Sequence, residues 1–183
     1  MKKDNTMEGK MLFHNCTVIT MNENMDIIEN GALVVDEGRF LEVGTSGSLI
    51  NKYGNHKKID LDSQIVIPGL INTHTHIPMV FFRGLADDFP LKEWLEDYIW
   101  PMEGKMIDEE FIKWGSKLGM MEMLSTGTTA FADMYFYEEE VARAVKEAGM
   151  RASLGEGIIG LPTPDAKNPE KNIERFKMLS QRW

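Results

Sequence analysis

The chain has 183 residues, of which 43% are hydrophobic and 27% are charged, and its formal net charge is −9. This acidic balance, with no basic patch and no apolar run of about 18 residues, argues against nucleic-acid, anionic-membrane and membrane-spanning roles. The single cysteine, Cys16, excludes an internal disulfide and, together with a start too polar for a signal peptide, predicts a cytoplasmic protein.

Short strands separated by turns are predicted for a first domain, residues 1–64. The stretch Asp36-Glu37-Gly38 between two apolar-rich runs is typical of a β-hairpin, because Gly38 can adopt a positive φ. No helical periodicity is visible before residue 65, and residues 1–10 have the character of a loose tail, so we expect a small all-β layer. Its strands are predicted at Met11–Thr20, Gly31–Asp36, Arg39–Val43 and Lys58–Leu61.

From Ile65 the pattern changes to strands that alternate with helices, which is typical of parallel βαβ units. Asp108 is a suitable N-cap for a long helix, and Gly127 is placed to end it. That helix is indicated by apolar residues at helical spacing, namely Phe111, Trp114, Leu118 and Met121. The strands are predicted at Ile65–Thr73 (with a break at Pro68-Gly69), Thr128–Tyr135 and Met150–Leu154, and the other helices at Leu91–Trp100, Glu138–Ala148 and Pro169–Leu179.

The number of predicted βα units is too small for a closed barrel. A (β/α)₈ barrel takes about 250 residues, whereas residues 65–183 contain three predicted units. Three parallel strands would also leave an unpaired edge. We therefore expect residues 65–183 to form an α/β domain that is the truncated front portion of a barrel.

The stretch Pro68 to Met79, which reads PGLINTHTHIPM, places His74 and His76 two residues apart at the end of an apolar run. Alternate side chains of a strand point to one face, so both imidazoles would project together from its carboxyl end, where α/β barrels place their chemistry. Two such histidines also occur by chance, but two neutral imidazoles that converge on one point provide half of a metal site. Zinc, iron or nickel would suit them.

The segment PGLINTHTHIPMVFFRGLADDFPLKEWLEDYIWPMEGK resembles the first-strand signature of the amidohydrolase superfamily, and STGTTAFADMYF and AGMRASL fit the same group. Within that superfamily, it is similar to the 5-methylthioadenosine/S-adenosylhomocysteine deaminases. The resemblance implies a metal-dependent (β/α)₈ TIM barrel, incomplete here, preceded by part of a small β-sandwich. It also implies hydrolytic deamination of an adenine ring, in which a metal-activated water attacks and ammonia leaves.

The resemblance assigns roles to four residues. His74 and His76 match the first two ligands of a divalent metal, with zinc as the first choice and iron or nickel as alternatives. Glu103 matches a glutamate that holds ribose hydroxyls, since a carboxylate can accept two hydrogen bonds from a vicinal diol. Trp94 matches an aromatic residue that packs against the nucleoside. The competing interpretations are a solvated loop carboxylate for Glu103 and ordinary helix packing for Trp94.

The sequence departs from the family pattern downstream of these residues. The other histidines, His14 and His56, precede the barrel part, so the later metal ligands and the glutamate that moves protons have no counterpart here. We therefore assign no catalytic residue in this chain, expect the general base in a missing C-terminal part, and expect the chain alone to be inactive. Glu156 also stands where some relatives carry a pocket arginine.

Other interpretations stay open. A sister amidohydrolase would act on another ring amine or amide, such as guanine, cytosine or a triazine. A non-catalytic interaction module would use an exposed β edge and apolar helix faces, and a homo-oligomer is a further option. The G-x-G-x-x-G pattern of residues 155–160 is read as a loop at the barrel mouth, because the prolines at 162 and 164 cannot begin the helix of a dinucleotide site. Asp133 is interpreted as a structural hydrogen-bond acceptor.

Overall fold

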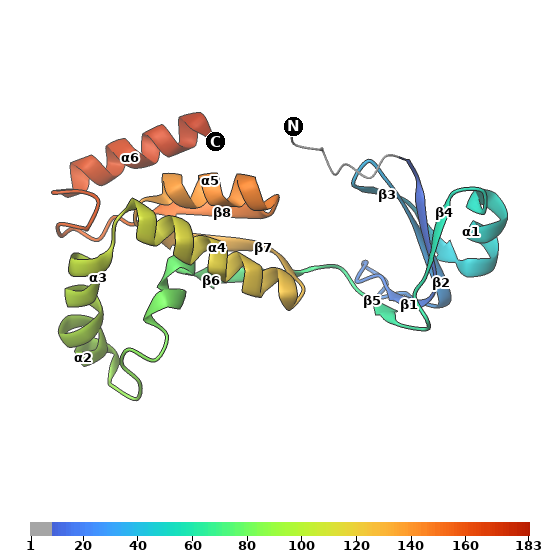
Figure 1. The fold of residues 1–183 in the computed structure, drawn as a ribbon, viewed down its shortest axis with the longest axis horizontal. Coiled ribbons are helices and arrows are strands. Elements are labelled where there is room, and N and C mark those ends of the chain that lie inside the picture. The colour runs from blue at the N-terminus through green and yellow to red at the C-terminus, as the bar shows by residue number, and fades with distance from the viewer. Residues whose placement is uncertain (1–8) are drawn as a thin grey trace. The chain divides into compact units, whose positions relative to one another are not determined.

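The computed structural model describes residues 9–183, and the chain divides into two compact units after Pro68 (Figure 1). The expected boundary after residue 64 lies slightly earlier, because Ile65–Val66 pairs with a strand of the first unit. The predicted tail, residues 1–10, falls almost wholly outside the described residues. Within residues 9–183, no helix combines the length and apolar character needed to cross a membrane.

The first unit is one mixed sheet with a helix on one face. The strand order is β3-β2-β1-β4, with β5 also paired to β1; β1 runs antiparallel to β2 and parallel to β4 and β5. The second sheet that a β-sandwich requires is not found among the described residues of this unit. Its elements are β1 (Met11–Ile19), β2 (Ile27–Asp36), β3 (Arg39–Thr45), α1 (Ser46–Tyr53), β4 (Lys57–Asp60) and β5 (Ile65–Val66).

The presence of α1 shows that the expectation of an all-β layer was wrong. The side chain of Thr45 caps this helix by accepting a hydrogen bond from the N–H of Ser48 at 3.4 Å. Leu49 is only 1% exposed and packs on Leu12 and Val34 of the sheet. The helix has eight residues and Leu49 is its one buried apolar residue, so the sequence shows too little helical periodicity to reveal it.

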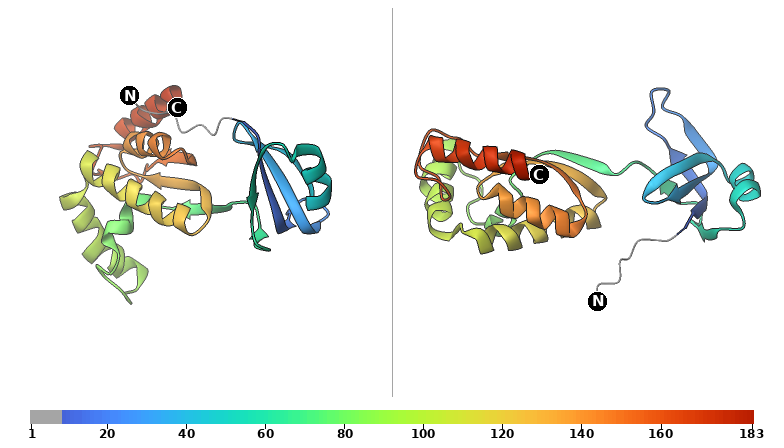
Figure 2. Two further views of the ribbon diagram at one scale, coloured as in Figure 1. Left: turned by 45° about the vertical axis from the view of Figure 1, so that its right-hand side comes forward. Right: turned by 90° about the horizontal axis from the view of Figure 1, so that it is seen from above.

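The second unit is an α/β layer built on a parallel sheet with the strand order β6-β7-β8, as the alternating pattern predicted. Helices α4 and α5 lie side by side against this sheet, and the strands end on the side where α3 lies (Figure 1 and Figure 2). The elements are β6 (Leu70–Thr75), η1 (Ile77–Phe82), α2 (Leu91–Glu93), η2 (Trp94–Ile99), α3 (Trp100–Met106), α4 (Glu109–Ser125), β7 (Thr128–Tyr135), α5 (Glu138–Ala148), β8 (Arg151–Glu156) and α6 (Pro169–Arg182).

Helix α4 begins at the predicted N-cap, where the carboxylate of Asp108 accepts the N–H of Phe111 at 2.8 Å. Two of the apolar residues that indicated this helix are not buried by it, since Trp114 is 53% exposed and Met121 is 62% exposed. The fully buried side instead carries Ile112 and Met120 together with small residues. Tertiary packing therefore selects a different face from the one with the largest apolar side chains.

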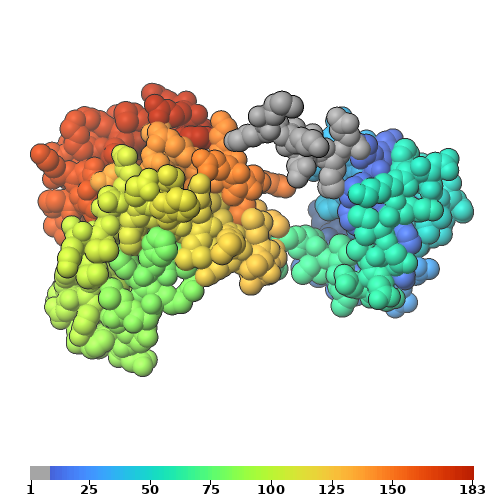
Figure 3. Space-filling model, viewed as in Figure 1, coloured from blue at the N-terminus to red at the C-terminus, as the bar shows by residue number. Residues whose placement is uncertain are grey.

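Helices α5 and α6 complete this unit. Helix α5 starts with three glutamates and ends at Gly149, whose φ of 70° only glycine adopts without strain. Helix α6 is tied to it by an ion pair between Arg182 and Glu139 and by Lys146, which lies 5.3 Å from the ring centre of Trp183. The space-filling view shows α4, α5 and α6 packed into one continuous surface (Figure 3).

Candidate metal and substrate site

His74 and His76 lie at the carboxyl end of β6 with their imidazole rings close together. The ring centres are 5.4 Å apart and the ring planes meet at 76°. His74 belongs to the strand and His76 follows its last residue, so the spacing of two places both rings at one strand end, as expected. His74 is exposed and His76 is half-buried, which leaves both rings within reach of a metal ion.

The hydrogen bonding of His76 fits a metal ligand. Its Nδ1 atom lies 2.5 Å from the main-chain oxygen of Met134 on β7. A carbonyl oxygen can only accept, so Nδ1 carries the proton and donates it to this bond. Nε2 then keeps its lone pair free, which is the form that a metal-binding imidazole requires.

The backbone after His76 is held by a carboxylate. The N–H of Ile77 donates to Oδ1 of Asp133 at 2.7 Å, so Asp133 is the structural hydrogen-bond acceptor that its position suggested. Burial raises the pKa of Asp133 to about 6, although the Ile77 amide opposes this rise. The side chain is only 5% exposed, so the hydrogen bond is shielded from water.

Helix α4 holds the same turn from another side by means of glycines. A Cβ atom on Gly115 would lie 2.7 Å from the main-chain oxygen of Pro78, and one on Gly119 would lie 2.5 Å from a side-chain carbon of Ile77. Any larger residue would therefore push η1 away from α4. These glycines allow the helix to contact the turn directly and fix where β6 ends.

A cavity of about 250 Å³ opens beside His76. Of the four residues that the sequence singled out, His76, Trp94 and Glu103 line it and His74 does not. Trp94 is half-buried and begins the π-helical stretch η2, a kind of helical distortion that often accompanies functional sites. The structure thus brings three of the four predicted residues to one hollow.

Glu103 is the polar anchor of this cavity, and it is buried rather than a solvated loop carboxylate. It is 7% exposed, and its Oε1 accepts a hydrogen bond from the hydroxyl of Tyr135 at 2.7 Å. Burial raises the pKa of Glu103, while the bond from Tyr135 works against that rise. Within residues 9–183 no donor is bonded to Oε2, so this oxygen remains able to accept hydrogen bonds from a ligand.

Further buried carboxyl groups lie near Asp133, and they do not line the cavity. Burial raises the pKa of Glu138 to about 10, helped by the nearby charge of Asp133, and burial raises that of Glu156 to about 8. Burial would also raise the pKa of Asp165, but hydrogen bonds and Arg175 lower it overall. Arg175 lies 3.1 Å from Asp165 and 3.6 Å from Glu156. These groups form a buried polar layer under the strand ends.

The loop after β8 does not support a dinucleotide site. No helix follows the glycine-rich residues 155–160 until α6 begins at Pro169. Glu156, which stands where some relatives carry a pocket arginine, does not line the cavity because it is turned into the buried polar layer. The predicted loop is therefore present, and its glycine and isoleucine residues at 157 and 159 form part of the cavity wall.

The donor set for a metal is incomplete among the described residues. In residues 9–183 no group of three or more His, Cys, Asp or Glu side chains is arranged to hold a metal ion. His74 and His76 provide two nitrogen donors, whereas zinc sites use three or four protein ligands. The two histidines fit part of a metal site, and a metal held there needs further donors.

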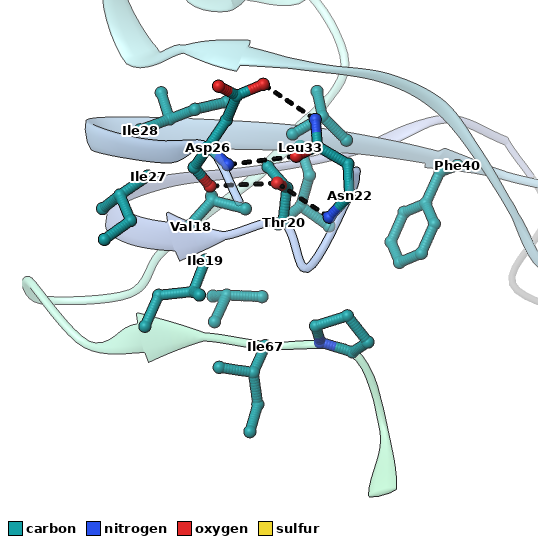
Figure 4. A pocket seen from close by; sticks show the side chains of 13 residues that line it. Val18, Ile19, Thr20, Asn22, Asp26, Ile27, Ile28, Leu33, Phe40 and Ile67 are labelled. Carbon is teal, nitrogen blue, oxygen red and sulfur yellow. Dashed lines mark hydrogen bonds between the residues drawn. The ribbon is translucent and has the colours of Figure 1, made fainter. Parts of the chain in front are cut away.

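A larger cavity, of about 660 Å³, lies in the first unit and has a different character (Figure 4). Its walls are apolar except at one turn, where Asn22 donates to the Asp26 carboxylate at 2.8 Å and Thr20 donates to the Asp26 carbonyl at 2.9 Å. No histidine, cysteine or glutamate lines it. It offers apolar surface without reactive groups.

Sequence reasoning did not select Tyr135 or Glu138. Tyr135 had a usable signal, because Asp133 and Tyr135 share one strand face at a carboxyl end, the same rule that selected the histidine pair. Glu138 had none, since a glutamate in the first turn of a helix is explained by the helix dipole. The role of the Met134 carbonyl is a main-chain property that no residue type reveals.

The chain is similar to several known proteins over most of its length. The model of the amidohydrolase family matches residues 65–183. The 5-methylthioadenosine/S-adenosylhomocysteine deaminase of Thermodesulfovibrio yellowstonii is 42% identical over 168 residues, covering 91% of this chain and 38% of that protein. The 5′-deoxyadenosine deaminase of Methanocaldococcus jannaschii is 48% identical over 161 residues, covering 83% and 37% respectively.

A solved structure is similar over the same part. It is an adenosine deaminase from Xanthomonas campestris with bound zinc, which superposes with a TM-score of 0.83 at 32% identity and covers 94% of this chain and 39% of that one. The present chain thus spans less than two fifths of the length of these relatives.

Proposed function

The chain belongs to the amidohydrolase family, and we propose that it supplies the first part of the metal and nucleoside site of an adenosine-type deaminase. The observation that carries this proposal is the free Nε2 of His76 beside a cavity that holds the buried carboxylate of Glu103. Relatives that deaminate 5-methylthioadenosine, S-adenosylhomocysteine or 5′-deoxyadenosine support the reaction class, the hydrolytic release of ammonia from an adenine ring. In this proposal residues 69–183 are the front portion of a (β/α)₈ barrel.

In this proposal His74 and His76 hold a divalent metal, zinc by preference and iron or nickel as alternatives. Two imidazoles at a strand end suit such an ion, and the zinc-containing adenosine deaminase structure supports the choice. When bound, the metal supplies a water of lowered pKa as the nucleophile. The bond from His76 to Met134 orients the imidazole so that Nε2 remains available.

Glu103 and Trp94 receive the nucleoside. The free Oε2 of Glu103 accepts hydrogen bonds from ribose hydroxyls, while Tyr135 keeps Oε1 in place. Trp94 provides an apolar face for packing against the nucleoside. A buried acceptor of this kind favours a nucleoside over guanine, cytosine or a triazine, because those rings carry no vicinal hydroxyls.

The chemical step needs groups that the described residues do not supply. Residues 9–183 offer two metal donors at this site, and Glu103 is engaged with Tyr135 rather than aimed at an adenine amino group. No general base is therefore assigned here. We expect the 183-residue chain with zinc to release no ammonia from 5-methylthioadenosine.

Binding to the chain tests the site without requiring turnover. We expect calorimetric titration to show zinc binding to the wild type and its loss in the His74→Ala/His76→Ala variant. With 5-methylthioadenosine, we expect Tyr135→Phe to weaken binding by about tenfold, because Glu103 loses the hydrogen bond that fixes it. Tyr98→Phe is the matched control, since the Tyr98 hydroxyl makes no hydrogen bond within residues 9–183 and the residue does not line the cavity.

Two results would contradict the proposal. Unchanged zinc affinity in the double-histidine variant would remove the metal site. Equal affinity for 5-methylthioadenosine and for free adenine would mean that Glu103 does not bind the ribose hydroxyls. It would favour the alternative function, that of an amidohydrolase acting on a ring without a ribose.

A further inference from the structure

Two buried carboxyl groups, Asp133 and Glu138, lie next to the His76 turn, and the contact between Asp133 and the Ile77 amide leaves most of their oxygens unexplained. Asp133 uses Oδ1 for the amide of Ile77, and its Oδ2 is buried without a donor from residues 9–183. Glu138, the first residue of α5, is 0% exposed, and its carboxyl oxygens make no hydrogen bond of ordinary geometry within residues 9–183, although the Tyr135 main chain acts to lower its pKa. The two side chains lie within hydrogen-bonding reach of each other.

Burial without donors is costly, so this pair requires an explanation. A carboxyl group removed from water loses several kcal/mol of hydration unless hydrogen bonds replace it. Two adjacent buried carboxyl groups cannot both be ionised. With one proton between them, the protonated Glu138 donates a hydrogen bond to Oδ2 of Asp133. The shared proton leaves Oδ1 of Asp133 as a strong acceptor for the Ile77 amide.

The position of this arrangement connects it to His76. The Ile77 amide is the first backbone group after His76, and it is fixed by Asp133 on β7. The next residue of β7, Met134, accepts the proton of His76 Nδ1. The end of β7, which lies beside the end of β6 (Figure 1), therefore holds both the main chain beyond the histidine and the ring itself.

We propose that Asp133 and Glu138 are positioning residues for His76: Glu138 holds Asp133, and Asp133 holds the Ile77 amide, so that the His76 ring keeps its Nδ1 bonded to Met134 and its Nε2 free. The inference rests on the proposed function in one respect, since a free Nε2 matters for metal binding. The orientation of the ring is a property of the chain alone and can be measured without metal.

The tautomer of His76 gives the direct test. Long-range ¹H–¹⁵N spectra of the zinc-free chain, assigned with a His76→Asn variant, report which ring nitrogen carries the proton. We expect the wild type to hold the proton on Nδ1, and Asp133→Ala to move both nitrogen signals toward those of an unrestrained imidazole. Asp133→Asn keeps an oxygen acceptor for Ile77 and should retain the wild-type pattern. Glu138→Gln, which can still donate to Asp133, should also retain it, whereas Glu138→Leu should not.

Zinc affinity provides the second readout. Loss of a residue that supports a metal-binding histidine weakens metal affinity by about tenfold or more. We expect zinc affinity to fall by this amount in Asp133→Ala and Glu138→Leu. Ser116→Ala is the control, because Ser116 is a fully buried hydroxyl in the same unit without a hydrogen-bond partner in residues 9–183. Circular dichroism establishes that each variant is folded.

The inference is overturned if folded Asp133→Ala keeps the wild-type tautomer and zinc affinity, or if Asp133→Asn loses as much as Asp133→Ala. If the wild type binds no zinc at all, the proposed metal site fails. The tautomer comparison still decides the positioning role in that case.

Discussion

Among the described residues, the carboxyl groups whose pKa is raised by burial all lie in the second unit of the chain. In the first unit Glu42 and Asp60 lie at the surface, where hydrogen bonds lower their pKa, those to Glu42 coming first from Lys52. In the second unit Glu138 and Glu156 are buried, and the loss of water raises their pKa. The core of the first unit consists of apolar side chains around one sheet.

This difference separates a packing problem from a chemical one. An apolar core is specified by side chains that match in shape and volume. The larger cavity of the first unit is likewise lined mainly by apolar side chains. Buried carboxyl groups cost folding free energy, and they cluster at sites that use perturbed ionisable groups. In this chain they gather under the strand ends that carry His76, which supports the proposed site in the second unit.

The largest expected effect tests whether the two units are separate folding bodies. Ile112→Ala in α4 and Leu49→Ala in α1 each remove a fully buried side chain, and each should cost about 2–5 kcal/mol of unfolding free energy. Calorimetry should show that each change lowers the melting temperature of its own unit and leaves the other in place. If both units shift together in either variant, they unfold as one body.

A glycine pair sharpens the comparison at a smaller scale. Gly119→Ala would place a Cβ 2.5 Å from Ile77, so we expect a loss of about 1–3 kcal/mol in the second unit. Gly47→Ala in α1 meets no atom within 4 Å and should stabilise the first unit by about 0.5–1 kcal/mol. Urea denaturation measures both changes. Equal effects of the two substitutions would mean that α4 does not depend on close contact with η1.

A third test concerns the dependence of stability on pH between 5 and 8. Glu156 and Glu138 have raised pKa values in the folded state, so they bind protons that the unfolded chain has lost. Their contribution is complete below the ordinary glutamate pKa and is lost as pH rises through about 8 for Glu156. The slope is at most about 1.4 kcal/mol per pH unit for each group.

The unfolding free energy of the first unit should change little between pH 5 and pH 8. The pKa values of Glu42 and Asp60 are lowered, so their contribution is present above the ordinary carboxyl pKa and disappears only in acid. Melting temperatures of the two units from pH 5 to pH 8 check this contrast. Glu156→Gln should reduce the slope of the second unit, and a slope that Glu156→Gln leaves unchanged would exclude Glu156 as its source.

The periodic features of the fold could be predicted from the sequence. The bounds of β7 and α5 follow from the Thr128–Tyr135 run and from the glutamates and glycine that frame Glu138–Ala148. Helix α1 could not be predicted, because a short helix with one buried apolar residue leaves no period. The buried face of α4 was also hidden, since it is set by glycines that contact η1 rather than by large apolar residues.

Some features of the candidate site could be predicted from the sequence and others could not. His74 and His76 could be selected because two identical ligands at a strand end form a local pattern. The cavity that joins His76 to Glu103 depends on the helical run from α2 to α3 returning to the strand ends, which is a tertiary property. The raised pKa of Glu138 is caused mainly by burial, and burial of a single glutamate cannot be predicted from its neighbours in the chain.

The end of β7 works as a three-residue clamp. The side chain of Asp133, the carbonyl of Met134 and the side chain of Tyr135 each hold a different group, namely the Ile77 amide, the His76 ring and the Glu103 carboxylate. Because side chains alternate between the two faces of a strand, a shift of β7 by one residue would break all three of these hydrogen bonds. His76, the proposed metal ligand, and Glu103, the proposed substrate anchor, therefore depend on one register of this strand, and a shift of the strand would disturb both.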